Sequence, residues 1–138
     1  MIHETAIEPA LQPFSKPAFL YANTQFIAAF EDYRHQKIGD CVPKCNLAYE
    51  SVMKVSCGQK GFGYNPGNTT SKLLKTIMSK AQMNSFWESP LLIVGTLRNS
   101  LSSAHGAGET SKTVPEHIAN YALNVTASAL VFLHDHAY

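Results

Sequence analysis

Arginine is the scarcest charged residue of this chain, because Arg34 and Arg98 are the only two among 138 residues. Charged residues of all kinds make up 15%, and the formal net charge is +1. A surface with so little excess positive charge does not wrap a long nucleic acid, so any such contact is expected to be local. The sparse charge also predicts that a second copy of the chain covers part of the surface.

Cysteines are too few for a disulfide framework. Cys41, Cys45 and Cys57 are odd in number and lie in a helical pattern, which favours reduced thiols and a cytoplasmic location. The sequence offers no complete set of zinc ligands, and we expect neither a metal nor another cofactor. No secretory signal begins the chain, and the longest apolar run, residues 91–97, is too short to cross a bilayer, so no membrane association is expected.

No segment alternates apolar and polar residues convincingly enough to be a strand, so an all-α fold is predicted. Three prolines within residues 1–17 indicate an extended N-terminal arm, and a single helical domain is expected over residues 18–138. Apolar residues recur at helical spacing in five segments, which predict helices over about 18–35, 40–57 and 70–82, from 85 towards 105, and after 113.

Two of these helices carry more detailed expectations. Asp40 is expected to cap the second helix, with Pro43 in its first turn. On the same helix one buried stripe is predicted, made of Cys41, Cys45, Ala48, Val52 and Val55. On the last helix the buried face is predicted to comprise Ile118, Tyr121, Ala122, Val125, Ala129 and Phe132.

The segment that follows Leu91 is the most distinctive. Leu91, Val94, Arg98, Leu101 and His105 lie at spacings of four, three, four and three, which places them on one helical stripe. Arg98 and His105 should therefore point into a groove or an interface, about 10 Å apart over two turns. A guanidinium binds phosphate through a planar set of donors, and an imidazole exchanges a proton near neutral pH. This pairing predicts chemistry on a phosphodiester; the alternative is a helix C-terminus that two cations stabilise.

Glu50 and Lys54 form a second pattern, because they lie four residues apart in the order that stabilises a helix. On spacing alone this is a surface ion pair that contributes a few tenths of a kcal/mol, by the general rule for exposed pairs. The other interpretation, which depends on the resemblance described next, is that both residues support the Arg98 groove.

Five short blocks follow one another along the chain, at residues 48–54, 63–67, 95–99, 104–108 and 121–124. In this order they resemble the abortive-infection C-terminal (Abi_C-like) domain of the HEPN superfamily. Arg98, followed by His105 after six intervening residues, resembles the R-x4-6-H signature of that superfamily. The resemblance covers roughly residues 20–134 and implies a HEPN-like bundle of about five helices after the N-terminal arm.

The resemblance further implies a metal-independent endoribonuclease. Arg98 would bind and polarise the scissile phosphate, and Asn99 would orient it. His105 would carry the proton between the 2′-hydroxyl and the leaving oxygen, with a 2′,3′-cyclic phosphate as the product. The residues expected to support this site or to bind substrate are Glu50, Lys54, Ser102 and Gly106.

The implied partners are RNA, a second copy of the chain that completes the site at a homodimer interface, and an antitoxin or sensor protein. The implied role is antiviral defence or a toxin activity. Two other functions stay open on the sequence. One is a non-catalytic RNA- or protein-binding HEPN module in a phage-defence system, and the other is a purely structural dimerisation domain.

Overall fold

The computed structural model describes residue 14, residues 16–102 and residues 114–138. These residues form helices and the turns between them, with no strand among them, which confirms the all-α prediction. In chain order the elements are the 3-10 helix η2 (Pro17–Phe19), α2 (Leu20–Arg34), α3 (Ile38–Lys60), α4 (Thr70–Lys80), the 3-10 helix η3 (Ser85–Trp87), α5 (Glu88–Leu91), α6 (Ile93–Ser102) and α7 (Glu116–His136). Most of the predicted arm lies outside the described residues.

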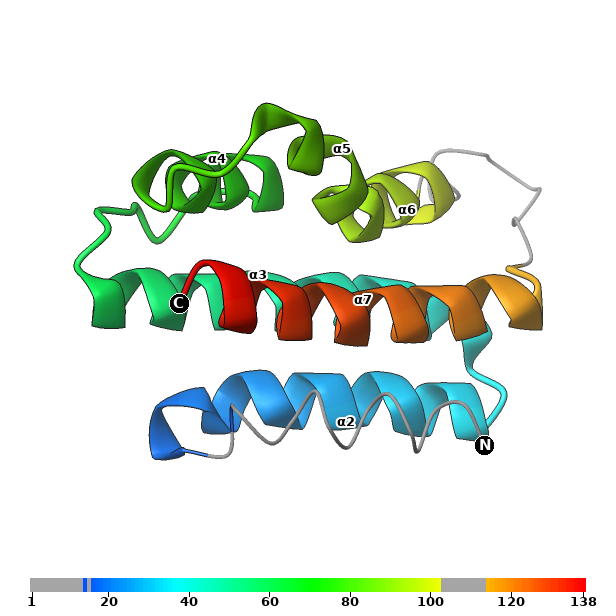
Figure 1. The fold of residues 1–138 in the computed structure, drawn as a ribbon. Coiled ribbons are helices and arrows are strands. Elements are labelled where there is room, and N and C mark those ends of the chain that lie inside the picture. Colours follow the sequence, from blue (N-terminus) through cyan, green and yellow to red (C-terminus); the bar gives the residue numbers. More distant parts are fainter. Residues whose placement is uncertain (1–13, 15, 103–113) are drawn as a thin grey trace.

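The helices form three layers (Figure 1). α3 and α7 run along the middle, α2 lies on one side of them, and α4, α5 and α6 lie on the other. α3 is the central helix, because it contacts α2, α4, α6 and α7. Within the described residues, no helix combines the length and the apolar character needed to cross a membrane.

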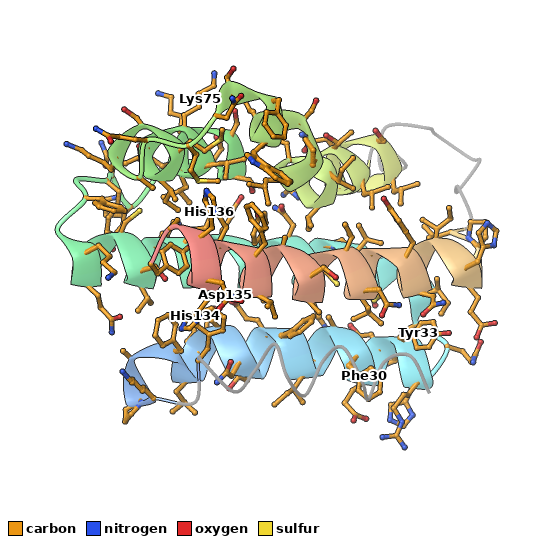
Figure 2. The ribbon with its side chains drawn as sticks, in the orientation of Figure 1. Phe30, Tyr33, Lys75, His134, Asp135 and His136 are labelled. Carbon is orange, nitrogen blue, oxygen red and sulfur yellow. The ribbon has the colours of Figure 1, made fainter. Side chains whose placement is uncertain are left out.

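Side chains of α2 hold this helix against the middle layer. Phe30 and Tyr33, labelled in Figure 2, are half-buried and pack against the core. Lys44 of α3 places its Nζ 2.5 Å from Asp32 Oδ2, and Asp32 is only 8% exposed. Because this carboxylate is mostly removed from water, loss of Lys44 would leave a buried charge without its partner.

The apolar stripe of α3 forms the centre of the core. Cys41, Cys45, Ala48 and Val52 are buried as predicted, and Val55 is half-buried against the same core. All three cysteines are free. A hydrogen bond with Cys41, together with burial, raises the pKa of the Cys45 thiol well above its usual value. This thiol therefore stays neutral and packs as a small apolar group.

The start of α3 corrects one prediction. The helix begins at Ile38 after Lys37, so Asp40 lies within the first turn and does not cap it. Its negative charge still interacts favourably with the helix N-terminus. Pro43 consequently falls in the second turn, where its missing N–H leaves the carbonyl of Gly39 without a helical partner. Gly39 is exposed, so water can satisfy that carbonyl.

The buried face of α7 differs from the predicted one. Ala122 and Ala129 are buried as expected, but Tyr121 is 51% exposed and the remaining three predicted residues are half-buried. α7 contacts α2, α3 and α6, so its buried face is broad and cannot be represented by one narrow stripe. The buried residues are Ala119, Ala122, Leu123, Thr126, Ala127, Ala129, Leu130 and Leu133.

The fourth predicted helix is divided into η3, α5 and α6, with the last break at Leu92. In a continuous helix the Leu91 carbonyl would accept the N–H of Gly95. No such bond forms here, and the buried Tyr49 hydroxyl of α3 donates to that carbonyl instead, at 2.9 Å. Pro90 has no N–H to donate to the Phe86 carbonyl, so it acts at the earlier boundary between η3 and α5.

The break at Leu92 separates Leu91 from the rest of the stripe predicted through Arg98. Val94, Arg98 and Leu101 stay together on α6, where Val94 is buried and Leu101 is half-buried. Arg98 is exposed, and it lines the edge of a groove.

Candidate functional site

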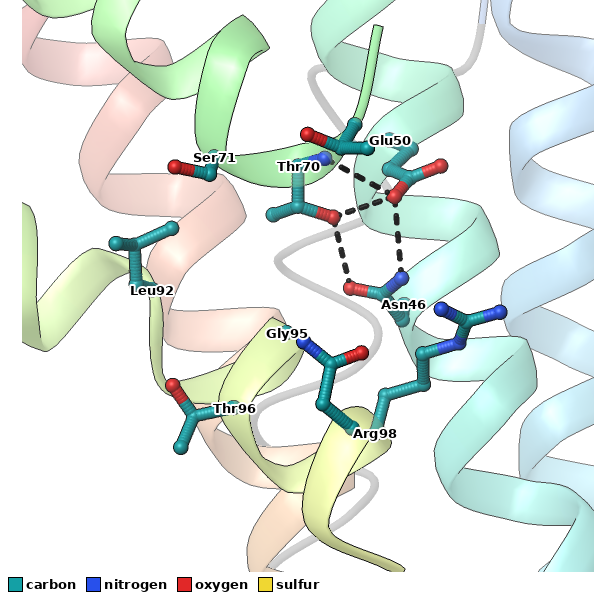
Figure 3. A pocket seen from close by; sticks show the side chains of 10 residues that line it. Asn46, Glu50, Thr70, Ser71, Leu92, Gly95, Thr96 and Arg98 are labelled. Carbon is teal, nitrogen blue, oxygen red and sulfur yellow. Dashed lines mark hydrogen bonds between the residues drawn. The ribbon is translucent and has the colours of Figure 1, made fainter. Parts of the chain in front are cut away.

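A groove of about 280 Å³ lies between α3, α4 and α6 (Figure 3). Three parts of the chain meet there, namely the middle of α3, the N-terminus of α4 and the segment from Leu92 into α6. The lining residues are Asn46, Glu50, Thr69, Thr70, Ser71, Leu92, Gly95, Thr96, Arg98 and Asn99. All but one of these, Leu92, are polar or glycine, so the groove suits a polar ligand.

A hydrogen-bonded network of Asn46, Glu50 and Thr70 forms one wall of the groove (Figure 3). Glu50 Oε2 accepts three hydrogen bonds, from the Thr70 N–H at 3.1 Å, the Thr70 hydroxyl at 2.5 Å and Asn46 Nδ2 at 3.2 Å. The Thr70 hydroxyl also lies 3.0 Å from Asn46 Oδ1. The network therefore ties α3 to the first turn of α4.

The same network satisfies a backbone group at the start of α4. Thr70 is the first residue of this helix, so its N–H has no acceptor within the helix and needs one elsewhere. Glu50 supplies it from the neighbouring helix. A carboxylate at this position also interacts favourably with the positive end of the α4 dipole. The wall of the groove is thus held by contacts that also stabilise the fold.

Gly95 keeps the floor of the groove open. It is buried in α6 against the network, and a Cβ added there would lie 3.5 Å from Thr70 Cγ2 and 3.6 Å from Asn46 Oδ1. These are ordinary van der Waals distances, so α6 approaches the network about as closely as a residue with a small side chain would allow. Any longer side chain at this position would occupy the groove.

Arg98 and Asn99 follow Gly95 by one helical turn and lie at the edge of the groove. Both are exposed. Three of the residues selected from the sequence, Arg98, Asn99 and Glu50, therefore line one groove. The groove combines a cation that can bind a phosphate with a fixed carboxylate that can accept a hydrogen bond.

The remaining predicted site residues are placed differently. Lys54 is half-buried on α3, does not line the groove, and makes no ion pair with Glu50 among the described residues. The surface pair considered for Glu50 is therefore not formed, because its carboxylate is bonded to Thr70 and Asn46 instead. Ser102 ends α6. His105 and Gly106 lie outside the described residues.

Sequence reasoning missed Asn46, Thr70 and Gly95. Asn46 precedes Glu50 by four residues and so shares its helical face, which is a signal that the spacing already contained. Thr70 gave no such signal, because it lies 20 residues from Glu50. Within the described residues, no three His, Cys, Asp or Glu side chains gather closely enough to hold a metal ion.

Comparison with protein families identifies the chain. The family model Abi_C, described as a HEPN-like domain, matches residues 20–137. The chain belongs to this family. The family match confirms the resemblance that the ordered sequence blocks indicated, and it makes the chain a defence-associated HEPN-like module. Comparisons with curated proteins and with solved structures found no significant match.

The groove has a defined place in this HEPN-like domain. It lies within the matched region, on the side of the middle layer that α4 and α6 cover. Its arginine comes from α6, the helix that leads towards His105. The groove therefore includes Arg98, the first residue of the segment that resembles the HEPN signature.

Proposed function

We propose that this HEPN-like domain is a metal-independent endoribonuclease that binds RNA in the groove between α3, α4 and α6. The observation that carries the proposal is the meeting of Arg98, Asn99 and Glu50 in that groove, although α3 and α6 are far apart in the sequence. These side chains match the chemistry of one ribonucleotide, since a phosphate needs cationic donors and a hydroxyl needs an acceptor.

The proposed reaction uses the RNA as its own nucleophile. Arg98 binds the scissile phosphate and stabilises the charge that grows on it, while Asn99 orients a phosphate oxygen. His105 accepts the proton of the 2′-hydroxyl and then protonates the leaving 5′-oxygen. The bond from O2′ to phosphorus forms as the bond from phosphorus to O5′ breaks, which leaves a 2′,3′-cyclic phosphate. The part given to His105 rests on the family resemblance.

The proposal includes a homodimer in which two such segments face each other. Family membership supports this arrangement, and the exposure of Arg98 and Asn99 leaves them accessible to a second copy. Three free thiols fit a reducing compartment, and we place the activity in the cytoplasm. In this setting the domain acts as a defence or toxin module that an antitoxin or a sensor protein controls.

Cleavage of single-stranded RNA by the purified full chain in EDTA tests the function. Arg98→Ala and His105→Ala should each lower the rate by at least about 100-fold, the usual effect of losing a group that stabilises the transition state. Arg34→Ala is the matched control, because it removes the only other arginine, which is exposed and pairs with Glu31 at 3.6 Å. The melting temperature of each variant should stay close to that of the wild type.

The outcomes separate the functions that the sequence left open. Cleavage that persists in His105→Ala contradicts the assigned mechanism. RNA binding without cleavage, lost in Arg98→Ala, selects a non-catalytic binding module. If neither substitution affects RNA and both lower only the melting temperature, the domain is structural.

A further inference from the structure

The Glu50 carboxylate is held more firmly than a surface carboxylate. Its Oε2 accepts hydrogen bonds from Asn46 and from both the N–H and the hydroxyl of Thr70. Asn46 and Thr70 are 4% and 5% exposed, so the groups that hold Glu50 are themselves fixed by packing. The carboxylate therefore presents one orientation to the groove before any ligand binds.

The Thr70 hydroxyl has one proton and lies near two acceptors. Glu50 Oε2 is 2.5 Å away and Asn46 Oδ1 is 3.0 Å away. The shorter distance and the charge of the carboxylate assign the proton to Glu50. Asn46 then directs its amide N–H to the same oxygen, which fixes the orientation of its side chain. Thr70 and Asn46 thus act together on Oε2.

The second carboxylate oxygen, Oε1, is left for another donor. Every hydrogen bond found for Glu50 among the described residues ends on Oε2. A carboxylate oxygen is only an acceptor, so the group that it recognises must carry a proton. Glu50 shares the groove with Arg98, which suits a phosphate. In RNA the hydroxyl next to each 3′-phosphate is the ribose 2′-hydroxyl, which DNA lacks.

We propose that Glu50 Oε1 accepts a hydrogen bond from a ribose 2′-hydroxyl while Arg98 binds the adjacent phosphate, and that Thr70 and Asn46 are positioning residues for this contact. The inference rests on the proposed function, since it assumes that RNA occupies the groove. It adds that the groove distinguishes RNA from other nucleic acids during binding. In the bound RNA the 2′-hydroxyl donates to Glu50, and the same proton passes to His105 only when the hydroxyl attacks the phosphate.

Binding of a short single-stranded RNA and of the same sequence with 2′-fluoro sugars tests the contact. Fluorine replaces the donor but keeps an RNA-like sugar, and the full-length His105→Ala chain prevents cleavage in both cases. The chain should bind the RNA about tenfold more tightly, as expected for one hydrogen bond to a charged acceptor. Glu50→Gln and Thr70→Val should each reduce this preference, whereas Thr70→Ser should keep it.

Thr76→Val is the matched control on the same helix, because the Thr76 hydroxyl donates only to the Lys72 carbonyl, at 3.1 Å. It should leave the preference unchanged. An equal preference in Glu50→Gln, Thr70→Val and the parent chain overturns the inference and leaves RNA binding intact. A loss of preference in Thr76→Val as large as in Thr70→Val also overturns it. Failure of the parent chain to bind either oligonucleotide overturns the proposed function instead.

Discussion

Buried polar groups are bonded differently at two places along α3, the groove around Glu50 and the region around Ser56. In the groove, Glu50 Oε2 accepts hydrogen bonds from the Asn46 amide and from the N–H and hydroxyl of Thr70. Near the C-terminal end of α3, the buried Ser56 Oγ and Tyr138 Oη make no well-aligned hydrogen bond within the described residues. Burial raises the pKa of Tyr138, and a contact with the Ser56 hydroxyl lowers it by a smaller amount. Both regions are enclosed, so burial alone does not explain the difference.

The difference shows what the groove requires. Burial of an unpaired hydroxyl costs free energy, whereas a hydroxyl that donates to a carboxylate avoids that cost and fixes the orientation of both groups. The groove network therefore contributes to stability and also presents Glu50 beside Arg98. Ser56 and Tyr138 contribute mainly the packing of their carbon atoms. Removal of a hydroxyl should consequently lower the free energy of unfolding more in the groove than near Ser56.

The largest effect is expected for Glu50→Ala. The substitution leaves the Thr70 N–H and the Asn46 amide without their acceptor, and it should lower the free energy of unfolding by about 2 to 3 kcal/mol. Urea denaturation of the purified chain measures this change, and Lys54→Ala on the same helix provides the control. A loss below about 0.5 kcal/mol would show that the network does not stabilise the fold.

High pH should destabilise the fold through Tyr138, which lies in the region around Ser56. Burial raises the pKa of Tyr138 above its ordinary value of 10.0. Below that value the phenol is protonated in both states, but above it only the unfolded state ionises, so stability falls as the pH rises. Above pH 10, the free energy of unfolding of the wild type should fall by about 1.4 kcal/mol per pH unit because of Tyr138, and Tyr138→Phe should remove this contribution. Melting temperatures of the wild type and of Tyr138→Phe, measured from pH 8 to 11, check this. The prediction is wrong if both melting temperatures fall equally steeply with pH.

Thr70→Val removes the groove hydroxyl that donates to Glu50. The Glu50 carboxylate then loses its shortest hydrogen bond, and the free energy of unfolding should fall by about 1 kcal/mol. Thr70→Ser restores the donor and should recover most of that loss. Urea midpoints of the two variants decide the matter, since equal midpoints would mean that the hydroxyl contributes nothing.

Ser56→Ala removes a hydroxyl from the second region and should have the smallest effect. Because Ser56 Oγ makes no well-aligned hydrogen bond within the described residues, the free energy of unfolding should change by less than about 0.5 kcal/mol or increase. The same urea experiment applies. A loss as large as that of Thr70→Val would remove the contrast between the two regions.

The sequence was sufficient wherever a local pattern decided the structure. α4 buries Leu73, Leu74, Ile77 and Met78 at helical spacing, and the α3 stripe was predicted in the same way. The break at Leu92 was not predicted. Its main cause is the hydrogen bond from Tyr49 to Leu91, which joins residues 42 apart and leaves no local pattern.

The same limit applies to the groove. Arg98 and Asn99 were selected from a short motif, and Glu50 from the family resemblance. Thr70 was not selected, because its role depends on a contact across 20 residues that only the packing of α3 against α4 creates. Local spacing identified the residues with distinctive chemistry, and tertiary contacts supplied the groups that hold them.

A nuclear magnetic resonance titration tests the central claim, that the groove holds RNA, most directly. Full-length His105→Ala, labelled with ¹⁵N, would be titrated with a short single-stranded RNA while the backbone amide shifts are recorded. The account predicts saturable shifts concentrated at Thr70, Gly95 and Asn99, and little change at Ser56. Shifts that are absent from the groove, or concentrated near Ser56, would contradict it.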